Sequence, residues 1–347
     1  MRVAQVAPLY ESVPPKFYGG TERVVSNLTD ELVNQGHDVT LFASGDSVTK
    51  AKLISPVKNS LRLDESCVDP LAHHFFMTEM VLKEVHNFDL IHFHVDYLHF
   101  PVSRRENLTH LTTLHGRLDI PDLFPLFNEY AEMPLVSISN SQRKPLPNVN
   151  WVGTVYHGLP PDLYSLQENP GTYLAFLGRI SPEKRLDRAI DIAKGAGIPI
   201  KIAAKVDKAD REYYESIIKP ILNHPLVEFL GEITEDEKND FLGNALALLF
   251  PIDWPEPFGL VMIEAMACGT PVIAYSEGSV PEIVEDGVTG YVIKSIEEGE
   301  KAVEKVSSLS RKGIRQVFEG RFTTHQMVSN YVEIYEKLIE TALDEVA

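Results

Sequence analysis

The chain has 347 residues, which is long for one domain and sufficient for two, because single hydrophobic cores tend to split beyond about 250–300 residues. Its composition, 44% hydrophobic and 24% charged, is typical of a soluble globular protein, and no apolar run approaches the roughly 20 residues that span a bilayer. The net charge of −18 argues against nucleic acid as a partner.

The N-terminal residues do not resemble a signal peptide, because they contain no long apolar stretch. Cys67 and Cys268 are expected to lie in different domains, which argues against a disulfide framework or a metal cluster. We therefore expect a cytoplasmic protein without membrane association.

The first half of the chain alternates strand patterns with helix patterns. Residues 2–7 predict a strand, residues 22–35 predict a helix, and Gly36 takes the position that follows a helix C-terminus. Further strands are expected at residues 38–43, 90–93, 111–114 and 135–137. Strands that alternate with helices imply right-handed crossovers and a parallel sheet.

The Gly and Pro residues of VYHGLPP, at 155–161, interrupt this pattern and predict a linker. The alternation then restarts, with strands expected at 173–177, 200–203, 227–230, 247–250 and 272–274. Helices are expected at 184–196, 210–221, 235–242, 259–268 and, with an amphipathic pattern, at 325–343. The predicted fold class is α/β, with doubly wound Rossmann-like domains at 1–158 and 159–324 that face each other across a cleft.

The densest chemical signal is PEPFGLVMIEAMACGTPVIA, at residues 255–274. A loop delivers Glu256, and Gly259 opens a helix whose unpaired N–H groups and partial positive charge suit a phosphate. This helix is apolar nearly all round, so Glu264 within it is a carboxylate on a buried helix. Ligand hydroxyls would satisfy Glu264, and an internal Arg or Lys partner is the alternative.

A second signal, GRISPEKR, follows the strand at 173–177. Ser181 is a plausible N-cap with Pro182 in the first helical position. Arg179 and Lys184 are cations at a strand's carboxyl end and suit a diphosphate, which they could neutralise without a metal. The alternative is that Lys184 belongs to a solvated first helical turn.

A third signal is the glycine pair Gly19 and Gly20 in FYGGTE, ahead of the first helix. Such a pair lets the backbone approach a ligand, although it is not a dinucleotide-binding fingerprint. A plain flexible loop is the alternative.

The fourth signal is His115, which follows the strand at 111–114 and could donate or accept a hydrogen bond near a sugar. A single histidine is more often structural, and His92, His94 and His99 compete for the same role.

Taken together, these segments resemble the family 4 glycosyltransferases, which are retaining enzymes of the GT-B fold. The matching segments are FYGGTERVVSNLTDELVNQGHDVTLFA, LIHFH, TLHG, VYHGL, FLGRISPEKRLDRAI, VEFLGEI, EPFGLVMIEAMACGTPVIA and GSVPEIVEDGVTGYVI. The spacing from Glu256 to Glu264 looks like the family's Glu-x7-Glu signature.

The resemblance implies a role for each site residue. Arg179 and Lys184 would hold the donor diphosphate, Glu264 the ribose, and Glu256 the transferred sugar. His115 would lie near the sugar's reacting face, and it joins Glu256, Arg179 and Lys184 as a catalytic candidate. The full expected donor-binding set is Gly19, Gly20, Arg179, Lys184, Gly231, Ile233, Glu256, Phe258, Gly259, Leu260 and Glu264.

The resemblance also implies a reaction, the transfer of a hexose, glucose from a UDP-linked donor. A small soluble acceptor is expected, because neither half of the sequence has a Lys/Arg-rich run of the kind that docks on anionic membranes. No Asp-x-Asp motif stands at a plausible site, so we expect no metal and no other cofactor. The family's C-terminal helix crosses back to the first domain, so residues 325–347 are expected to do the same.

The glycine loop and the GDSVTKAKL stretch resemble a bacterial subgroup associated with glucosylation of tetrahydrobiopterin from UDP-glucose. Other classes remain open on the sequence alone. They include a nucleotide-sugar epimerase of the same fold and a nucleotide-sugar binding protein without catalysis. A nicotinamide-dependent dehydrogenase is disfavoured, because no glycine fingerprint follows the first strand.

Overall fold

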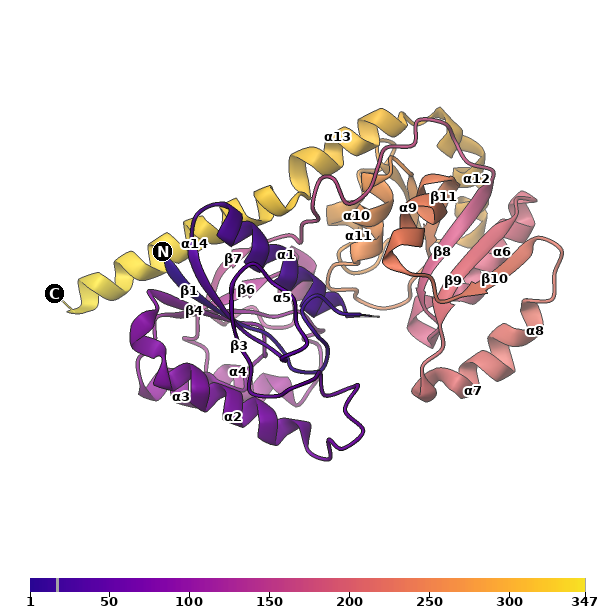
Figure 1. The fold of residues 1–347 in the computed structure, drawn as a ribbon. Coiled ribbons are helices and arrows are strands. Elements are labelled where there is room, and N and C mark those ends of the chain that lie inside the picture. The colour runs from indigo at the N-terminus through magenta and orange to yellow at the C-terminus, as the bar shows by residue number, and fades with distance from the viewer. Residues whose placement is uncertain (17–18, 347) are drawn as a thin grey trace. The chain divides into compact units, whose positions relative to one another are not determined.

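The computed structural model of the protein describes residues 1–16 and 19–346, apart from the side chains of residues 345 and 346. The chain divides into two compact units (Figure 1). The first unit contains Met1–Pro160 together with Thr324–Ala347, and the second contains Pro161–Thr323. The division expected after residue 158 therefore lies two residues before the observed one.

A seven-stranded parallel sheet forms the centre of the first unit, in the order β3–β2–β1–β4–β5–β6–β7. Its strands are β1 (Arg2–Val6), β2 (Asp38–Phe42), β3 (Lys52–Ile54), β4 (Leu90–Phe93), β5 (His110–Thr113), β6 (Leu135–Ser137) and β7 (Trp151–Thr154). The strand order reverses between β1 and β4, where Gln5 lies opposite His92. Open α/β sheets bind ligands at such a reversal, beyond the carboxyl ends of the strands.

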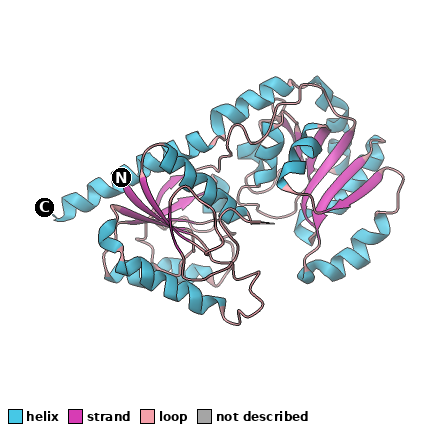
Figure 2. Ribbon diagram, viewed as in Figure 1, coloured by secondary structure: helices cyan, strands magenta, loops and turns pink. Residues whose placement is uncertain are grey.

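Helices cover both faces of this sheet (Figure 2). They are α1 (Gly20–Asn34), α2 (Pro70–Lys83), α3 (Phe100–Arg105), α4 (Leu123–Glu129), α5 (Asn140–Arg143) and α14 (Thr324–Val346). Helix α1 buries the apolar residues that predicted it, and Val25 packs with Leu41 of the sheet. Gly36 has a φ of +86°, in the left-handed region that glycine accepts without strain.

The C-terminal helix α14 belongs to the first unit and lies beside α1 (Figure 1). Tyr331 and Tyr335 are fully buried, and their hydroxyl groups contact side chains of β1, β4 and β5. A buried tyrosine hydroxyl needs a hydrogen-bond partner, and the polar residues of these strands supply one. The amphipathic pattern predicted this helix, and the two tyrosines anchor it to the sheet.

The second unit has a six-stranded parallel sheet in the order β10–β9–β8–β11–β12–β13. Its strands are β8 (Tyr173–Arg179), β9 (Ile200–Lys205), β10 (Val227–Gly231), β11 (Ala245–Phe250), β12 (Val272–Tyr275) and β13 (Gly290–Ile293). Leu174, Ile202 and Leu249 from three of these strands form one core with Leu186 and Ile190 of a covering helix. The order again reverses, here between β8 and β11.

The helices of the second unit are α6 (Leu186–Ala196), α7 (Arg211–Tyr213), α8 (Lys219–Ile221), α9 (Glu235–Gly243), α10 (Leu260–Ala267), α11 (Val280–Ile283), α12 (Ile296–Lys305) and α13 (Arg311–Arg321). Helix α9 begins with a capping box, in which Thr234 and Glu237 satisfy each other's backbone N–H groups. Helix α10 is buried on nearly every side, as its apolar sequence predicted.

The helix expected at 184–196 begins later than predicted. Residues Pro182–Lys184 form a separate 3₁₀ turn, and Arg185 has a φ of +51°, which interrupts the helix. The guanidinium of Arg185 pairs with Asp187 at 2.7 Å and with Asp253 at 2.8 Å, and these ion pairs stabilise the interruption. Ser181 does not cap the turn with its side chain, so its expected N-cap role was wrong.

The helix expected at 210–221 is also interrupted. Residues Tyr214–Ile218 adopt a π-helical turn between α7 and α8. Pro220 follows this turn and lacks the N–H group that would bond to Ser216, so regular α-helical bonding cannot continue through it. Within the described part of the chain, no helix is both long and apolar enough to cross a membrane.

Candidate functional site

The topology of the second unit gathers most of the predicted donor residues at one edge of its sheet. Arg179 ends β8, and Lys184 follows it. Glu256 and Gly259 follow β11, which pairs directly with β8. Because the strands are parallel, their carboxyl ends share one edge, so residues distant in sequence converge there.

Lys184 and Glu256 form an ion pair at this edge. Their side chains are only 14% and 12% exposed, so bulk water screens the pair weakly. The indole N–H of Trp254 also donates to Glu256 Oε2, at 2.9 Å. The Lys184 ammonium lies 5.0 Å from the centre of the Trp254 ring and 5.5 Å from that of Phe250, within the range of a cation–π contact.

Arg179 lies among acidic side chains. Its guanidinium donates to Glu183 at 2.8 Å and lies 3.6 Å from Asp207 and 3.9 Å from Asp210. The Nε of Arg179 is buried and has no hydrogen-bond partner among the described residues, and the same is true of Ser181 Oγ. Buried polar atoms without a partner are rare, and a ligand at this edge would satisfy them.

Glu264 has the internal partner that the sequence left open. Lys238 of α9 donates to Glu264 Oε1 at 3.0 Å, and it also lies 3.1 Å from Glu235. The Glu264 side chain is 5% exposed, so this ion pair offsets the cost of burying its carboxylate. The sequence did not single out Lys238.

Gly259 opens helix α10 in the left-handed region, with a φ of +80°. This backbone conformation favours glycine, and a Cβ atom there would also lie 2.8 Å from Met262 Cε. Within the described chain, no side chain caps this helix start. Leu260 is the first residue of the helix, and the carbonyl of Phe258 accepts from Ser279 Oγ at 2.7 Å.

The backbone of Glu256 is fixed by the segment that follows β12. Ser279 donates its N–H to the Glu256 carbonyl at 3.0 Å. A Cβ atom at Gly278 would lie 2.3 Å from the Glu256 backbone nitrogen. The close approach of these two backbones explains why a glycine stands at 278.

Gly231 and Ile233 lie at and just beyond the carboxyl end of β10. Gly231 has a φ of +75°, and a Cβ atom there would meet no described atom within 4 Å. The backbone at this position is therefore open to a ligand. Ile233 is partly exposed.

Gly19 and Gly20 lie in the first unit, at the start of α1, while Phe17 and Tyr18 of the same motif lie outside the described residues. Gly19 is extended, and a Cβ atom there would lie 2.8 Å from Pro15 Cβ. Close packing against Pro15 is thus one reason for glycine at this position.

His115 lies in the first unit, just after β5, as predicted. Its Nε2 lies 2.9 Å from Nδ1 of His94, and its ring stacks on His157 with the ring centres 5.4 Å apart. Burial lowers the pKa of His115 to about 3 and holds the pKa of His94 well below its usual range. Both rings are therefore neutral at pH 7.

Gln142 positions the loop that carries His115. Its amide group donates to the carbonyls of Leu114 and Gly116, each at 2.8 Å. Its own oxygen accepts from the N–H of Ile138 at 2.9 Å. No local sequence pattern singles out Gln142, because its role depends on backbone groups of the loop after β5 and of the residue after β6.

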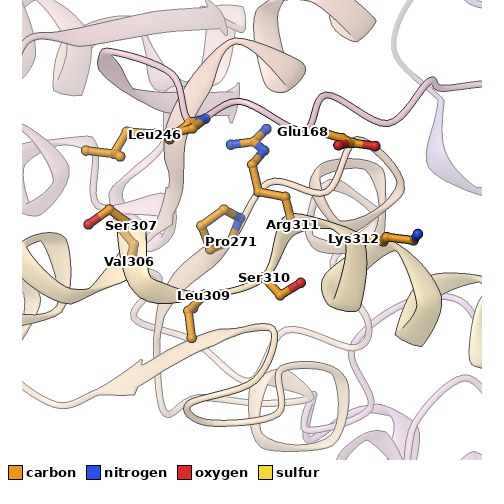
Figure 3. A pocket seen from close by; sticks show the side chains of 10 residues that line it. Glu168, Leu246, Pro271, Val306, Ser307, Leu309, Ser310, Arg311 and Lys312 are labelled. Atoms are coloured by element: carbon orange, nitrogen blue, oxygen red, sulfur yellow. The ribbon is translucent and has the colours of Figure 1, made fainter.

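A cavity of about 270 Å³ lies at the opposite edge of the second unit's sheet, near the amino ends of β11 and β12 (Figure 3). Its described lining contains none of the predicted site residues. The Arg311 guanidinium beside it donates to the carbonyls of Gln167, Gly243 and Ala245. Arg311 is therefore a structural cross-link.

Among the described residues, no group of three or more His, Cys, Asp or Glu side chains is arranged to hold a metal ion.

Comparison with known families gives two matches. Residues 148–323 match Glycosyl transferases group 1, and residues 18–176 match Glycosyltransferase Family 4. The chain is 25% identical over 369 residues to N-acetyl-alpha-D-glucosaminyl L-malate synthase of Bacillus anthracis. That match covers 91% of this chain and 93% of the relative.

Solved structures show the same architecture. AviGT4, a glycosyltransferase involved in avilamycin A biosynthesis, matches with a TM-score of 0.74 and 22% identity over 98% of both chains. Anabaena HepE in complex with UDP and glucose matches with a TM-score of 0.71 and 17% identity over 96% of this chain and 98% of that one. These matches confirm the expected fold class, two parallel-sheet α/β domains of the GT-B type.

Proposed function

We propose that this chain, which belongs to the glycosyl transferases of group 1, moves glucose from UDP-glucose to a small soluble acceptor. That the protein is a glycosyltransferase follows from the family itself. The donor, the acceptor, the stereochemistry and the independence from metal are the parts that we propose.

The observation that carries the proposal is the convergence of Lys184, Glu256 and the start of α10 at one sheet edge. Lys184 supplies a positive charge, and the helix start at Gly259 supplies backbone N–H groups and the positive end of the helix dipole. Bond cleavage in the donor leaves negative charge on the diphosphate, so these groups stabilise the transition state more than the ground state.

The two carboxylates contact different parts of the donor. Glu264, on the buried helix α10, accepts hydrogen bonds from the ribose hydroxyls. These hydrogen bonds replace part of its contact with Lys238. Glu256, on the loop before α10, accepts a hydroxyl of the transferred sugar. Gly231 and Ile233 meet the nucleobase through their backbone.

UDP-glucose is proposed as the donor because HepE was crystallised with UDP and glucose. The small acceptor is proposed from the name of the Bacillus anthracis relative, which joins an N-acetylglucosaminyl group to L-malate. Tetrahydrobiopterin is a second small acceptor that the subgroup resemblance suggests.

We further propose that the anomeric configuration is retained through attack from the face that the phosphate leaves. The leaving phosphate then helps to remove the proton of the acceptor hydroxyl. Arg179, Lys184 and the α10 start together neutralise the diphosphate, so no metal is needed for this step.

UDP is expected to bind without any divalent metal. Calorimetric titration of UDP, GDP and ADP into the protein in excess EDTA measures this directly, and UDP should give the lowest Kd. The matched control is the same titration with Mg²⁺ in place of EDTA, which should change the Kd for UDP by no more than about twofold. Complete loss of UDP binding in EDTA would refute the metal-free site, and tighter binding of GDP or ADP would refute the choice of uridine.

A further inference from the structure

Seven side chains of the first unit form one continuous chain of hydrogen bonds. From helix α14 to the loop after β5 they are Tyr331, Thr113, His92, Tyr335, Gln5, His94 and His115. Successive donor and acceptor atoms are 2.7 to 3.1 Å apart. Of these seven residues only His115 was expected to have a role at a substrate, so the other six need a separate explanation.

The direction of the chain near His115 is set by the amide of Gln5. Its Oε1 lies 2.8 Å from His94 Nε2, and a carbonyl oxygen can only accept. His94 therefore carries its hydrogen on Nε2 and presents Nδ1 as an acceptor. His115 must then donate its own Nε2 hydrogen to His94, at 2.9 Å, and a neutral His115 is left with a lone pair on Nδ1.

Tyr335 is the second hydrogen-bond partner of that amide. The Gln5 Nε2 group donates to Tyr335 Oη at 3.1 Å, and the hydroxyl passes its hydrogen to His92 Nδ1 at 2.7 Å. His92 in turn donates from Nε2 to Thr113 Oγ1 at 2.7 Å. Rotation of the Gln5 amide by half a turn would reverse the hydrogen of every member of this series together, so the tautomer of His115 is coupled to Gln5 and Tyr335.

The free end of the chain is His115 Nδ1. This atom is shielded from solvent and has no hydrogen-bond partner among the described residues. A buried acceptor without a partner is unfavourable, which points to a ligand that donates a hydrogen there. The ring itself is held in place by the stacked His157 and by the clamped backbone at Leu114 and Gly116.

We propose that Gln5 and Tyr335 are positioning residues, which fix the tautomer of His115 so that its Nδ1 accepts a hydrogen from a substrate hydroxyl group. This inference rests on the proposed glycosyl transfer, since it assigns His115 to a sugar or acceptor hydroxyl. The opposite tautomer would present an N–H group at Nδ1, which suits a phosphate or carbonyl oxygen. The hydrogen-bond series thus favours a group that donates a hydrogen at this position, as a hydroxyl does.

The tautomer is read from long-range ¹H–¹⁵N correlation spectra of the full-length protein labelled with ¹⁵N-histidine. In the native protein at pH 7, His94 and His115 should both carry hydrogen on Nε2 and none on Nδ1. Tyr335→Phe and Gln5→Met should each convert His115 into a mixture of tautomers. Each should also lower kcat/KM for UDP-glucose by about tenfold, the scale of one net hydrogen bond.

Tyr331→Phe is the matched control, because it removes one buried hydroxyl from the same helix at the far end of the chain. It should leave the His115 tautomer and kcat/KM unchanged. A native His115 that is protonated on Nδ1 would overturn the proposal, as would Tyr335→Phe and Gln5→Met proteins that keep a single Nε2 tautomer and native kinetics. These spectra need no turnover. Absence of glycosyl transfer would therefore refute the proposed function without changing the tautomer result. A wrong tautomer would likewise refute the role of Gln5 and Tyr335 without refuting glycosyl transfer.

Discussion

Replacement of Lys184 by alanine is expected to lower kcat by about 100–1,000-fold, because removal of one group that stabilises developing negative charge typically has that effect. The ammonium group lies in a mostly buried ion pair with Glu256, beside two aromatic rings that exclude water. In such surroundings a charge acts more strongly on a leaving diphosphate than it would in bulk water. Steady-state kinetics with UDP-glucose measure the change, and thermal unfolding measures stability separately.

Lys201→Ala is the matched control for this variant. Lys201 also forms an ion pair, with Glu228 at 3.5 Å, and also lies over an aromatic ring, that of Tyr173 at 4.7 Å. It lies on β9, away from the carboxyl edge of the sheet. Its removal should change neither kcat nor KM by more than about twofold. If Lys184→Ala retains near-native turnover, the diphosphate assignment is wrong.

Glu256→Gln and Glu264→Gln are expected to affect different kinetic constants. Glu264, at the ribose, should mainly raise KM, by about 10- to 100-fold. Glu256, at the transferred sugar, should lower kcat by about 100-fold as well, because its contact strengthens as the glycosidic bond breaks. Glutamine preserves the shape of each side chain, so the comparison isolates the charge. Kinetics at varied UDP-glucose concentration separate the two constants.

Glu235→Gln is the control for Glu264, because both carboxylates contact Lys238. If Glu264 serves only to balance Lys238, then Glu264→Gln and Glu235→Gln should both lower the unfolding midpoint and leave KM unchanged. That outcome would return Glu264 to a structural role. A selective rise in KM for Glu264→Gln alone supports the ribose contact.

The sequence predicted the fold well where strands are buried and helices are amphipathic. The strands at 90–93 and 135–137 match β4 and β6, because both are fully buried and mostly apolar. The short strands β3, β7 and β13 were missed, since their partly exposed segments of three or four residues carry little pattern. Long-range pairing with the neighbouring strands of the sheet determines them, and no local signal reports such pairing.

The sequence names candidate site residues by type, but it does not report the contacts that they make. Lys184 and Glu256 were both expected at the donor, yet their pairing with each other depends on the adjacency of β8 and β11. Lys184 was expected within a helix, and the left-handed Arg185 places it in a turn instead. Lys238, Gln142 and the order of hydrogen bonds from Gln5 to His115 escaped detection, because each joins segments that are distant in sequence.

Glycosyl transfer is tested most directly by incubation of UDP-glucose with the native protein in EDTA and a panel of small hydroxylated acceptors, including tetrahydrobiopterin. Mass spectrometry and the anomeric proton coupling in ¹H NMR identify the product. We expect an α-linked glucoside, with one UDP released for each glucoside formed. A β-linked product would contradict retention. A changed sugar without acceptor would indicate an epimerase, and UDP-glucose that binds but is recovered intact with every acceptor would contradict the proposed transfer.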